Sequence, residues 1–266
     1  MPDDRDVALT NPDLPEIVRK IRARTPARLL VGRAGAAYRT KTQMELREAH
    51  AAARDAVRGQ LHPAQALGDA FLKRWKLVEL RTKAHDKEEY LLRPDLGRHF
   101  DDRSRADIQN HCPPSCDLQI AIGDGLSVAA VASQVPSLLP LIFEAAKDRN
   151  WKMGQTLLVH YCRVGLLNEI GELLNPRVAV LLIGERPGLA TADGLSAYLA
   201  YRPRNSYTDA DRNVISNIHS RGLSSQEAAG RIVNFAAQMM KAEISGYRLK
   251  EELPALGDPS QGIRKN

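Results

Sequence analysis

The feature that most constrains the fold of this chain is an apolar run at positions 178–183 (V-A-V-L-L-I), which is followed directly by glycine. Strands buried on both faces of a parallel sheet are apolar nearly throughout, because neither face meets water. Similar runs at 118–122 and 157–161 precede it, with helix-forming segments after each. This alternation predicts an α/β fold with an open, mostly parallel, Rossmann-like sheet flanked by helices.

The chain divides by pattern into three predicted regions. We expect a smaller helical N-terminal region with a hairpin over 1–103, an α/β domain over 104–250 and a mobile tail over 251–266. In the first region, a Thr40–Gln43 capping box predicts the start of a helix that runs to about Pro63. Further predicted helices cover 14–24 and 65–75, and the hairpin pairs 77–81 with 90–92.

The α/β region carries its own boundary signals. Pro136 predicts a helix start near 138, for a helix that ends at 147, and residues 167–174 form the next helix. Residues 195–201 are a candidate fourth strand. Ser224 and Glu227 make a second capping box for a helix that Gly246 stops. We find no internal repeat in the sequence.

Charge and cysteine content narrow the classes of function. The net charge is +6, and arginines crowd positions 19–28. Because these arginines lie between apolar Ile17, Val18, Ile21 and Leu29, a solvated helix face is favoured over nucleic-acid binding. No apolar run approaches the roughly 18–20 residues that cross a bilayer, and the N-terminus has no apolar signal segment. The three cysteines are too few for a disulfide framework, which indicates the cytoplasm.

Ligands of open α/β sheets bind beyond the carboxyl ends of the strands. Three segments lie there: 123–127 (G-D-G-L-S), 161–165 and 184–188. The first could cradle a phosphate or dinucleotide, but the full glycine fingerprint is absent and Asp124 would repel an anion, so a turn with Ser127 as helix cap is favoured. Glu185 could be a general base, an acceptor for a ligand's amides or half of a salt bridge, and the spacing favours the salt bridge.

Other reactive side chains give weaker signals. His111, Cys112 and Cys116 lie close together, but no second pair of metal-ligand residues lies nearby, so we expect no metal site. Cys162 with His160 suggests a thiol nucleophile, although no third group orients the pair. No histidine lies in the pattern D-x-H-x-x-G, which supplies a lower ligand to cobalamin in some proteins. These residues are therefore not expected to form a metal site or a nucleophilic centre.

Five ordered motifs together resemble one family, the small (light) subunit of ethanolamine ammonia-lyase. They are G-R-A-G at 32–35, R-P-D-L-G-R at 93–98, D-G-L-S at 124–127, G-E-R-P-G-L at 184–189 and I-S-N-I-H at 215–219. The resemblance spans about residues 29–246. It implies an adenosylcobalamin-dependent lyase that converts ethanolamine to acetaldehyde and ammonia, and a hetero-oligomer of six large and six small subunits. It leaves open a location within a bacterial microcompartment.

The resemblance also implies a division of labour. The large subunit would be a TIM barrel that binds ethanolamine and carries the catalytic residues, so none is assigned to this chain. Cobalamin would lie between the two subunits. Three contacts carry over: Val164 through its backbone, Glu185 as acceptor for corrin amides, and Val214, where the family commonly has cysteine. The cofactor would keep its own base as lower ligand. Two rival interpretations are a stand-alone nucleotide-binding oxidoreductase and a purely structural assembly subunit.

Overall fold

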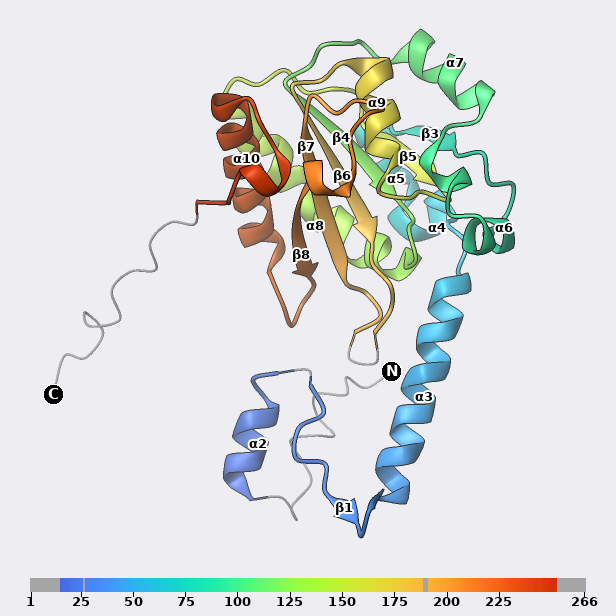
Figure 1. Cartoon of the computed structure of the whole chain (residues 1–266), viewed down its shortest axis with the longest axis vertical. Helices are drawn as coiled ribbons and strands as arrows, with labels where there is room; N and C mark the ends of the chain where they lie inside the picture. Colours follow the sequence, from blue (N-terminus) through green and yellow to red (C-terminus); the bar gives the residue numbers. More distant parts are fainter. Residues whose placement is uncertain (1–14, 26, 189–190, 253–266) are drawn as a thin grey trace, which may run out of the picture.

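A computed structural model describes residues 15–25, 27–188 and 191–252 of the chain. It shows a six-stranded sheet in the order β3-β5-β4-β6-β7-β8, flanked by helices (Figure 1). β3, β5, β4 and β6 are parallel, and β7 and β8 each run antiparallel to the preceding neighbour. The predicted α/β class with a mostly parallel sheet is confirmed.

The strands are β1 (Arg33–Ala34), β2 (Ala37–Tyr38), β3 (Val78–Arg81), β4 (Leu118–Gly123), β5 (Leu157–His160), β6 (Val178–Gly184), β7 (Leu195–Tyr201) and β8 (Asn213–Ile218). The α-helices are α2 (Glu16–Arg22), α3 (Thr40–Arg58), α4 (Pro63–Leu67), α5 (Asp69–Trp75), α6 (Lys87–Leu92), α7 (Asp102–His111), α8 (Val128–Lys147), α9 (Leu166–Leu174) and α10 (Ser225–Ala242). Short 3-10 turns are η1 (Leu96–Arg98), η2 (Asp209–Asp211) and η3 (Gly246–Arg248).

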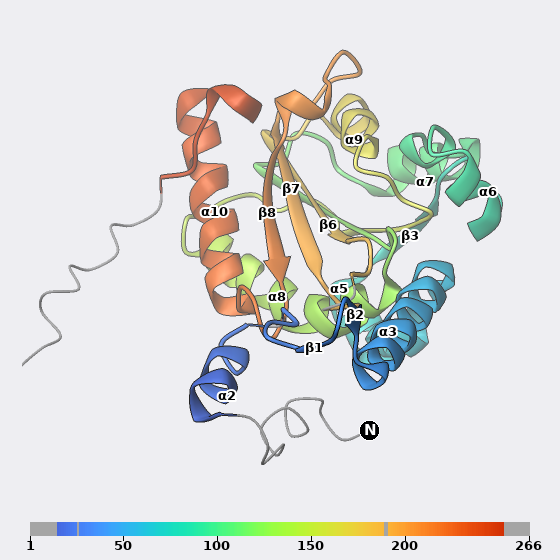
Figure 2. The same cartoon turned by 60° about the horizontal axis from the view of Figure 1, so that its bottom comes forward.

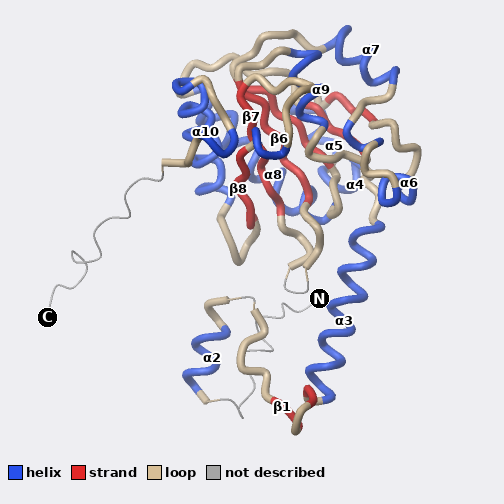
Figure 3. The backbone as a smooth tube through the Cα atoms, in the orientation of Figure 1, coloured by secondary structure: helices blue, strands red, loops and turns tan. Residues whose placement is uncertain are grey.

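Two apolar cores lie on opposite faces of the sheet. On one face α8 and α10 pack together over β4, β6, β7 and β8, with α4 and α5 beside them. On the other face α9 and α7 pack over β3, β5, β4 and β6. Figures 2 and 3 show α10 on one side of the strands and α9 and α7 on the other. The run at 178–183 is buried along its whole length, as a central strand requires.

Helix α8 is longer than predicted. It begins at Val128, where the Ser127 side chain accepts a hydrogen bond from the Ala130 N–H, and it continues through Pro136 and Pro140. Each proline removes a backbone donor, and burial of the helix's apolar face on the sheet offsets that cost. By length and composition alone α8 could cross a membrane, which the sequence inspection missed. In the fold it lies against the sheet.

The hairpin predicted within the first region is wrong. Residues 90–92 belong to α6, because the Asp86 side chain accepts from the Glu89 N–H and so caps a helix there. β3 instead joins the main sheet beside β5. β8 was not predicted as a strand, because polar Asn213, Ser216 and Asn217 interrupt its apolar pattern.

Several predicted helix boundaries also differ. The first capping box does not form, since α3 begins at Thr40 behind an extended Arg39 with no side-chain cap and ends at Arg58. Gly68, with φ of +81°, divides the predicted helix at 65–75 into α4 and α5. The second capping box is confirmed, although α10 ends at Ala242, before Gly246. The tail predicted from 251 lies outside the described residues beyond 252.

Residues 15–25 and 27–58 form an arm that projects from the body (Figure 1). It comprises α2, the β1–β2 pair and α3, whose only buried residue is Thr42. Ile17, Leu30, Tyr38 and Met44 are each more than half exposed. An isolated helix is only marginally stable in water, so the arm offers apolar surface that the described part of this chain does not cover.

Candidate functional site

The candidate site lies on the face of β7 and β8 opposite α10, at a place that no helix among the described residues covers. On the face that α9 and α7 occupy, the strands β7 and β8 extend past α9 and leave Tyr198 half-buried and Val214 exposed. Tyr198 and Val214 are directly opposed partners across the two strands. Their side chains therefore lie on the same face. β8 is also an edge strand, and such strands present unpaired backbone groups outward.

Val164 lies in the loop that follows β5, directly before α9. It lines a cavity of about 380 Å³ together with Tyr198. Its carbonyl accepts a hydrogen bond from the Leu167 N–H at 3.2 Å. Its own N–H donates to no acceptor among the described residues, and the residue is only half-buried. That N–H is therefore free to bind a ligand's carbonyl.

Glu185 follows β6, and its side chain turns toward β7. Its Oε1 accepts a hydrogen bond from the Tyr198 hydroxyl at 3.1 Å. Burial and the neighbouring Glu185 carboxylate raise the pKa of Tyr198 to about 12, so the hydroxyl stays a donor at neutral pH. The salt bridge predicted for Glu185 is wrong, because no cation pairs with it among the described residues. Its carboxylate keeps acceptor capacity for a second donor.

We refer to Val164, Glu185, Tyr198 and Val214 together as the Tyr198 surface. The three residues singled out from the sequence thus each adjoin Tyr198: one across a shared cavity, one through a hydrogen bond and one across the strand pair. Sequence reasoning missed Tyr198 itself. Its place in the candidate strand at 195–201 was a usable signal, because a tyrosine beside a strand-end carboxylate can donate to it.

A buried ionic cluster holds the loop that carries Val164. Asp124 is fully buried, and its Oδ1 accepts from the Cys162 N–H at 2.9 Å. Lys87, brought in by α6, donates from Nζ to the Gly125 carbonyl at 2.9 Å and lies 3.9 Å from Asp124 Oδ2. Burial raises the pKa of Asp124 and lowers the pKa of Lys87. The cluster fixes the ends of β4 and β5 against each other.

The segment at 123–127 is the turn and helix cap that the sequence favoured. The Leu126 N–H donates to the Gly184 carbonyl at 2.9 Å, which closes the turn over β6. A Cβ at Gly125 would lie 2.2 Å from that same carbonyl oxygen, so glycine is required there, and its φ is +55°. Lys87 Nζ donates to the Gly125 carbonyl from the interior, so buried protein groups already occupy the inner side of the turn.

The other reactive side chains do not form a centre. All three cysteines are free and buried. Burial raises the pKa of Cys162 and of Cys116, the latter to about 11, which disfavours the thiolate that a nucleophile needs. His160 contacts Glu79 at 2.7 Å between Nε2 and Oε1. No metal-ligating cluster is found in the part of the chain that the structure describes.

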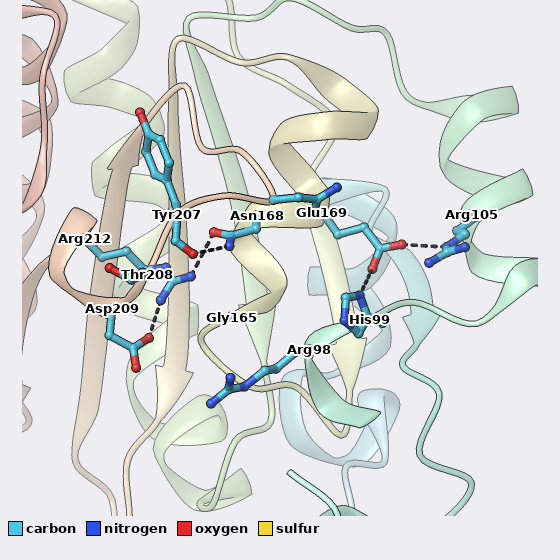
Figure 4. A pocket seen from close by; sticks show the side chains of 11 residues that line it. Arg98, His99, Arg105, Gly165, Asn168, Glu169, Tyr207, Thr208, Asp209 and Arg212 are labelled. Carbon is cyan, nitrogen blue, oxygen red and sulfur yellow. Dashed lines mark hydrogen bonds and ion pairs between the residues drawn. The ribbon is translucent and has the colours of Figure 1, made fainter. Parts of the chain in front are cut away.

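A second cavity, of about 520 Å³, adjoins the first along α9 and the β7–β8 connection (Figure 4). The two cavities share Arg98, Gly165, Asp209 and Arg212. On its far side Glu169 pairs with Arg105 at 2.6 Å, and Glu169 also contacts His99 at 3.3 Å. Charged side chains of Arg98, Asp209 and Arg212 line both cavities, and the smaller one includes Val164 and Tyr198 of the Tyr198 surface.

Comparison with known proteins gives one consistent result. The model of the ethanolamine ammonia-lyase light chain (EutC) family matches residues 15–250. A protein from Clostridium perfringens named ethanolamine ammonia-lyase small subunit is 39% identical over 246 residues, which cover 92% of this chain and 81% of that protein. Proteins of the same name from Clostridium acetobutylicum and Listeria innocua are 39% and 41% identical, covering 88% and 87% of this chain and 95% and 77% of theirs.

Proposed function

The chain belongs to the ethanolamine ammonia-lyase light-chain family, and we propose that its Tyr198 surface forms one wall of an adenosylcobalamin site. The small-subunit name of its relatives implies a large-subunit partner. In the proposed assembly the other wall, the bound ethanolamine and the catalytic residues belong to that partner, a TIM barrel present in six copies with six small subunits. The reaction would release acetaldehyde and ammonia in the cytoplasm.

The observation that carries this proposal is the convergence of complementary groups on an uncovered sheet face. A corrin has an apolar face and a periphery of neutral carboxamides, which donate through N–H and accept through C=O. The free N–H of Val164 suits a carboxamide oxygen, and the Glu185 carboxylate suits a carboxamide N–H. Exposed Val214 and half-buried Tyr198 supply apolar contact. The donor set therefore fits the group.

The chain's own residues would position the cofactor and exclude water. When bound, adenosylcobalamin would supply the radical chemistry. Tyr198 would keep the Glu185 carboxylate oriented, since its hydroxyl remains protonated at neutral pH. Val214 would contact the cofactor through the backbone of its edge strand, and a thiol-specific contact is lost because valine replaces the family's cysteine.

The nucleotide-binding oxidoreductase is the weaker alternative. Its main support was the G-D-G segment, which is closed over β6 and filled by Lys87 and Asp124. A purely structural role in assembly is the rival that the geometry leaves standing, and the following experiment separates it from the proposal.

The test is substitution Glu185→Ala in the complex co-purified with the large subunit. A hydrogen bond to a charged group contributes about 1.5–3 kcal/mol, so the dissociation constant for adenosylcobalamin should rise by about 10- to 100-fold. Size-exclusion chromatography should show the assembly intact. Equilibrium dialysis with absorption spectroscopy measures the affinity.

The matched control is Glu144→Ala, which removes an exposed carboxylate on α8, across the sheet from the Tyr198 surface. It should leave cofactor affinity unchanged. If Glu185→Ala behaves like this control while the wild-type complex binds the cofactor, the purely structural role is favoured and the assignment of Glu185 is wrong.

A further inference from the structure

The motif at 93–98, R-P-D-L-G-R, has no role in the site described so far. Its first arginine pairs with Asp95 at 2.8 Å in solvent, and its last three residues form η1. Gly97 meets the loop after β5 so closely that a Cβ there would lie 2.6 Å from Arg163 Cγ. The Arg163 N–H donates to the Gly97 carbonyl at 2.9 Å. The motif is therefore locked onto the loop that carries Val164.

The packing is reciprocal and places Arg98 at the edge of the Tyr198 surface. A Cβ at Gly165 would lie 2.9 Å from Arg98 Cγ, so the Arg98 stem lies directly over Gly165. Arg98, Arg163 and Arg212 all line the cavity that Val164 and Tyr198 line. Figure 4 shows Arg98 reaching from η1 toward the side of the cavity where Asp209 and Arg212 lie.

The charges around this cavity do not balance. Arg212 is satisfied by Asp209 and by Asn168 Oδ1 at 2.8 Å. The Arg98 backbone N–H donates to the Asp95 carbonyl at 3.1 Å, but its guanidinium makes no hydrogen bond or ion pair among the described residues. Arg163 stacks 4.1 Å from the centre of the Tyr90 ring and donates to the Tyr90 carbonyl, with no carboxylate partner in the same part of the chain. Two guanidinium groups are left without an anion.

The excess of positive charge affects the Arg212 side chain. Its side chain is 3% exposed, and its Nε has no hydrogen-bond partner. Burial lowers the pKa of Arg212, the Asp209 carboxylate opposes that change, and the charge of Arg98 lowers it further. Like charges that converge on one cavity favour binding of an anion, because the anion relieves their repulsion.

We propose that Arg98, supported by Arg163 and Arg212, binds a phosphodiester, and that this is the phosphate of the nucleotide loop of the cobalamin on the Tyr198 surface. The assignment rests on the proposed function. A cobalamin's peripheral amides are neutral, and its phosphodiester is its one peripheral anion. A guanidinium binds phosphate oxygens in a fixed two-pronged geometry that a lysine cannot reproduce. The Tyr198 surface would then bind the corrin. The cavity lined by Arg98, Arg163 and Arg212 would bind the phosphodiester of the nucleotide loop.

The experiment compares two coenzyme analogues that differ by the phosphodiester: adenosylcobinamide and adenosylcobinamide methyl phosphate. Both are titrated into the wild-type complex and into complexes with Arg98→Gln and Arg98→Lys, with affinity read by equilibrium dialysis. The wild type should prefer the phosphate-bearing analogue by about tenfold or more. Arg98→Gln should remove most of that preference, and Arg98→Lys should retain part of it.

The control is Arg93→Gln, which removes an exposed arginine of the same motif that does not line the cavity. It should leave the preference unchanged. An equal loss of affinity for both analogues in Arg98→Gln would mean that Arg98 only supports the loop. An unchanged preference, with weaker binding of the large subunit, would mean that a carboxylate of the partner occupies the cavity. Either result overturns the assignment.

Failure of the proposed function gives a different result. In that case the wild-type complex binds neither analogue nor adenosylcobalamin, and the assignment of the phosphate site falls with it. If adenosylcobalamin binds normally, only the comparison of the two analogues decides the role of Arg98.

Discussion

At the scale of single residues, the position of Val164 depends on two glycines. Gly97 and Gly165 let η1 and the loop after β5 approach until each backbone touches the other's arginine stem. A Cβ at Gly97 would also lie 2.8 Å from the Tyr161 carbonyl oxygen. The Arg163 side chain could move away from it, but this backbone oxygen could not. The close approach, rather than an unusual backbone angle, explains why glycine occupies this position.

We therefore predict that Gly97→Ala destabilises the fold by about 1–3 kcal/mol, the usual cost of overpacking a filled interior. Gly230→Ala is the matched control, because it lies in α10 with no atom within 4 Å of the added Cβ. That change should stabilise the fold by about 0.5–1 kcal/mol. Thermal unfolding of the purified chain measures both. A Gly97→Ala variant as stable as the wild type would contradict the close packing.

Individual site residues were predictable to different degrees. Val164 and Glu185 follow apolar strands, so strand assignment alone placed them at one edge of the sheet. Val214 came only from the resemblance, because its strand is half polar and was not predicted. The hydrogen bond between Glu185 and Tyr198 could not be foreseen, since it depends on β7 running antiparallel beside β6.

At the scale of elements, α10 carries a complete capping box at its start. The Ser224 hydroxyl accepts a hydrogen bond from the Glu227 N–H at 3.3 Å, and the Glu227 carboxylate accepts one from the Ser224 N–H at 3.2 Å. Bonds from the Ser224 side chain and backbone lower the pKa of Glu227 below its ordinary 4.5. A depressed carboxylate pKa stabilises the folded state above the unfolded value, and this contribution is lost as the pH falls through the folded value.

We predict that Ser224→Ala lowers the unfolding free energy by about 1 kcal/mol at neutral pH. This difference in unfolding free energy should shrink below pH 4.5, because a protonated Glu227 accepts the hydrogen bonds from Ser224 less strongly in the wild type. Urea unfolding at a series of pH values measures this. In a Glu227→Gln background, which keeps an acceptor but does not titrate, the deficit should not vary with pH. A pH-independent deficit in the wild-type background would disprove the link.

Elements were predictable where one physical signal dominated. The continuous apolar runs identified β4, β5 and β6, since only central strands are apolar on both faces. The start of α8 was predicted after Pro136, whereas the helix begins at Val128. Burial of the helix against the sheet outweighs the local cost of Pro136 and Pro140. The short run Tyr90–Leu92 was ambiguous between strand and helix, and the cap at Asp86 decided for helix.

At the scale of the whole molecule, two surfaces lack partners within the described chain. One is the Tyr198 surface, together with the cavity that Arg98, Arg163 and Arg212 line. The other is the arm, which holds Ile17, Leu30, Tyr38 and Met44 exposed. In the proposed assembly both surfaces would be available for contact with a partner subunit. The small-subunit name of the relatives is consistent with that account.

The central claim is that adenosylcobalamin contacts the Tyr198 surface when the large subunit is present. Amide hydrogen exchange, followed by mass spectrometry on the large–small complex with and without adenosylcobalamin, tests it most directly. The cofactor should slow exchange in peptides that cover 163–165 and 213–216, and should leave α8 on the opposite sheet face unchanged. Binding of the cofactor by the complex with no slowing at either segment would contradict the claim.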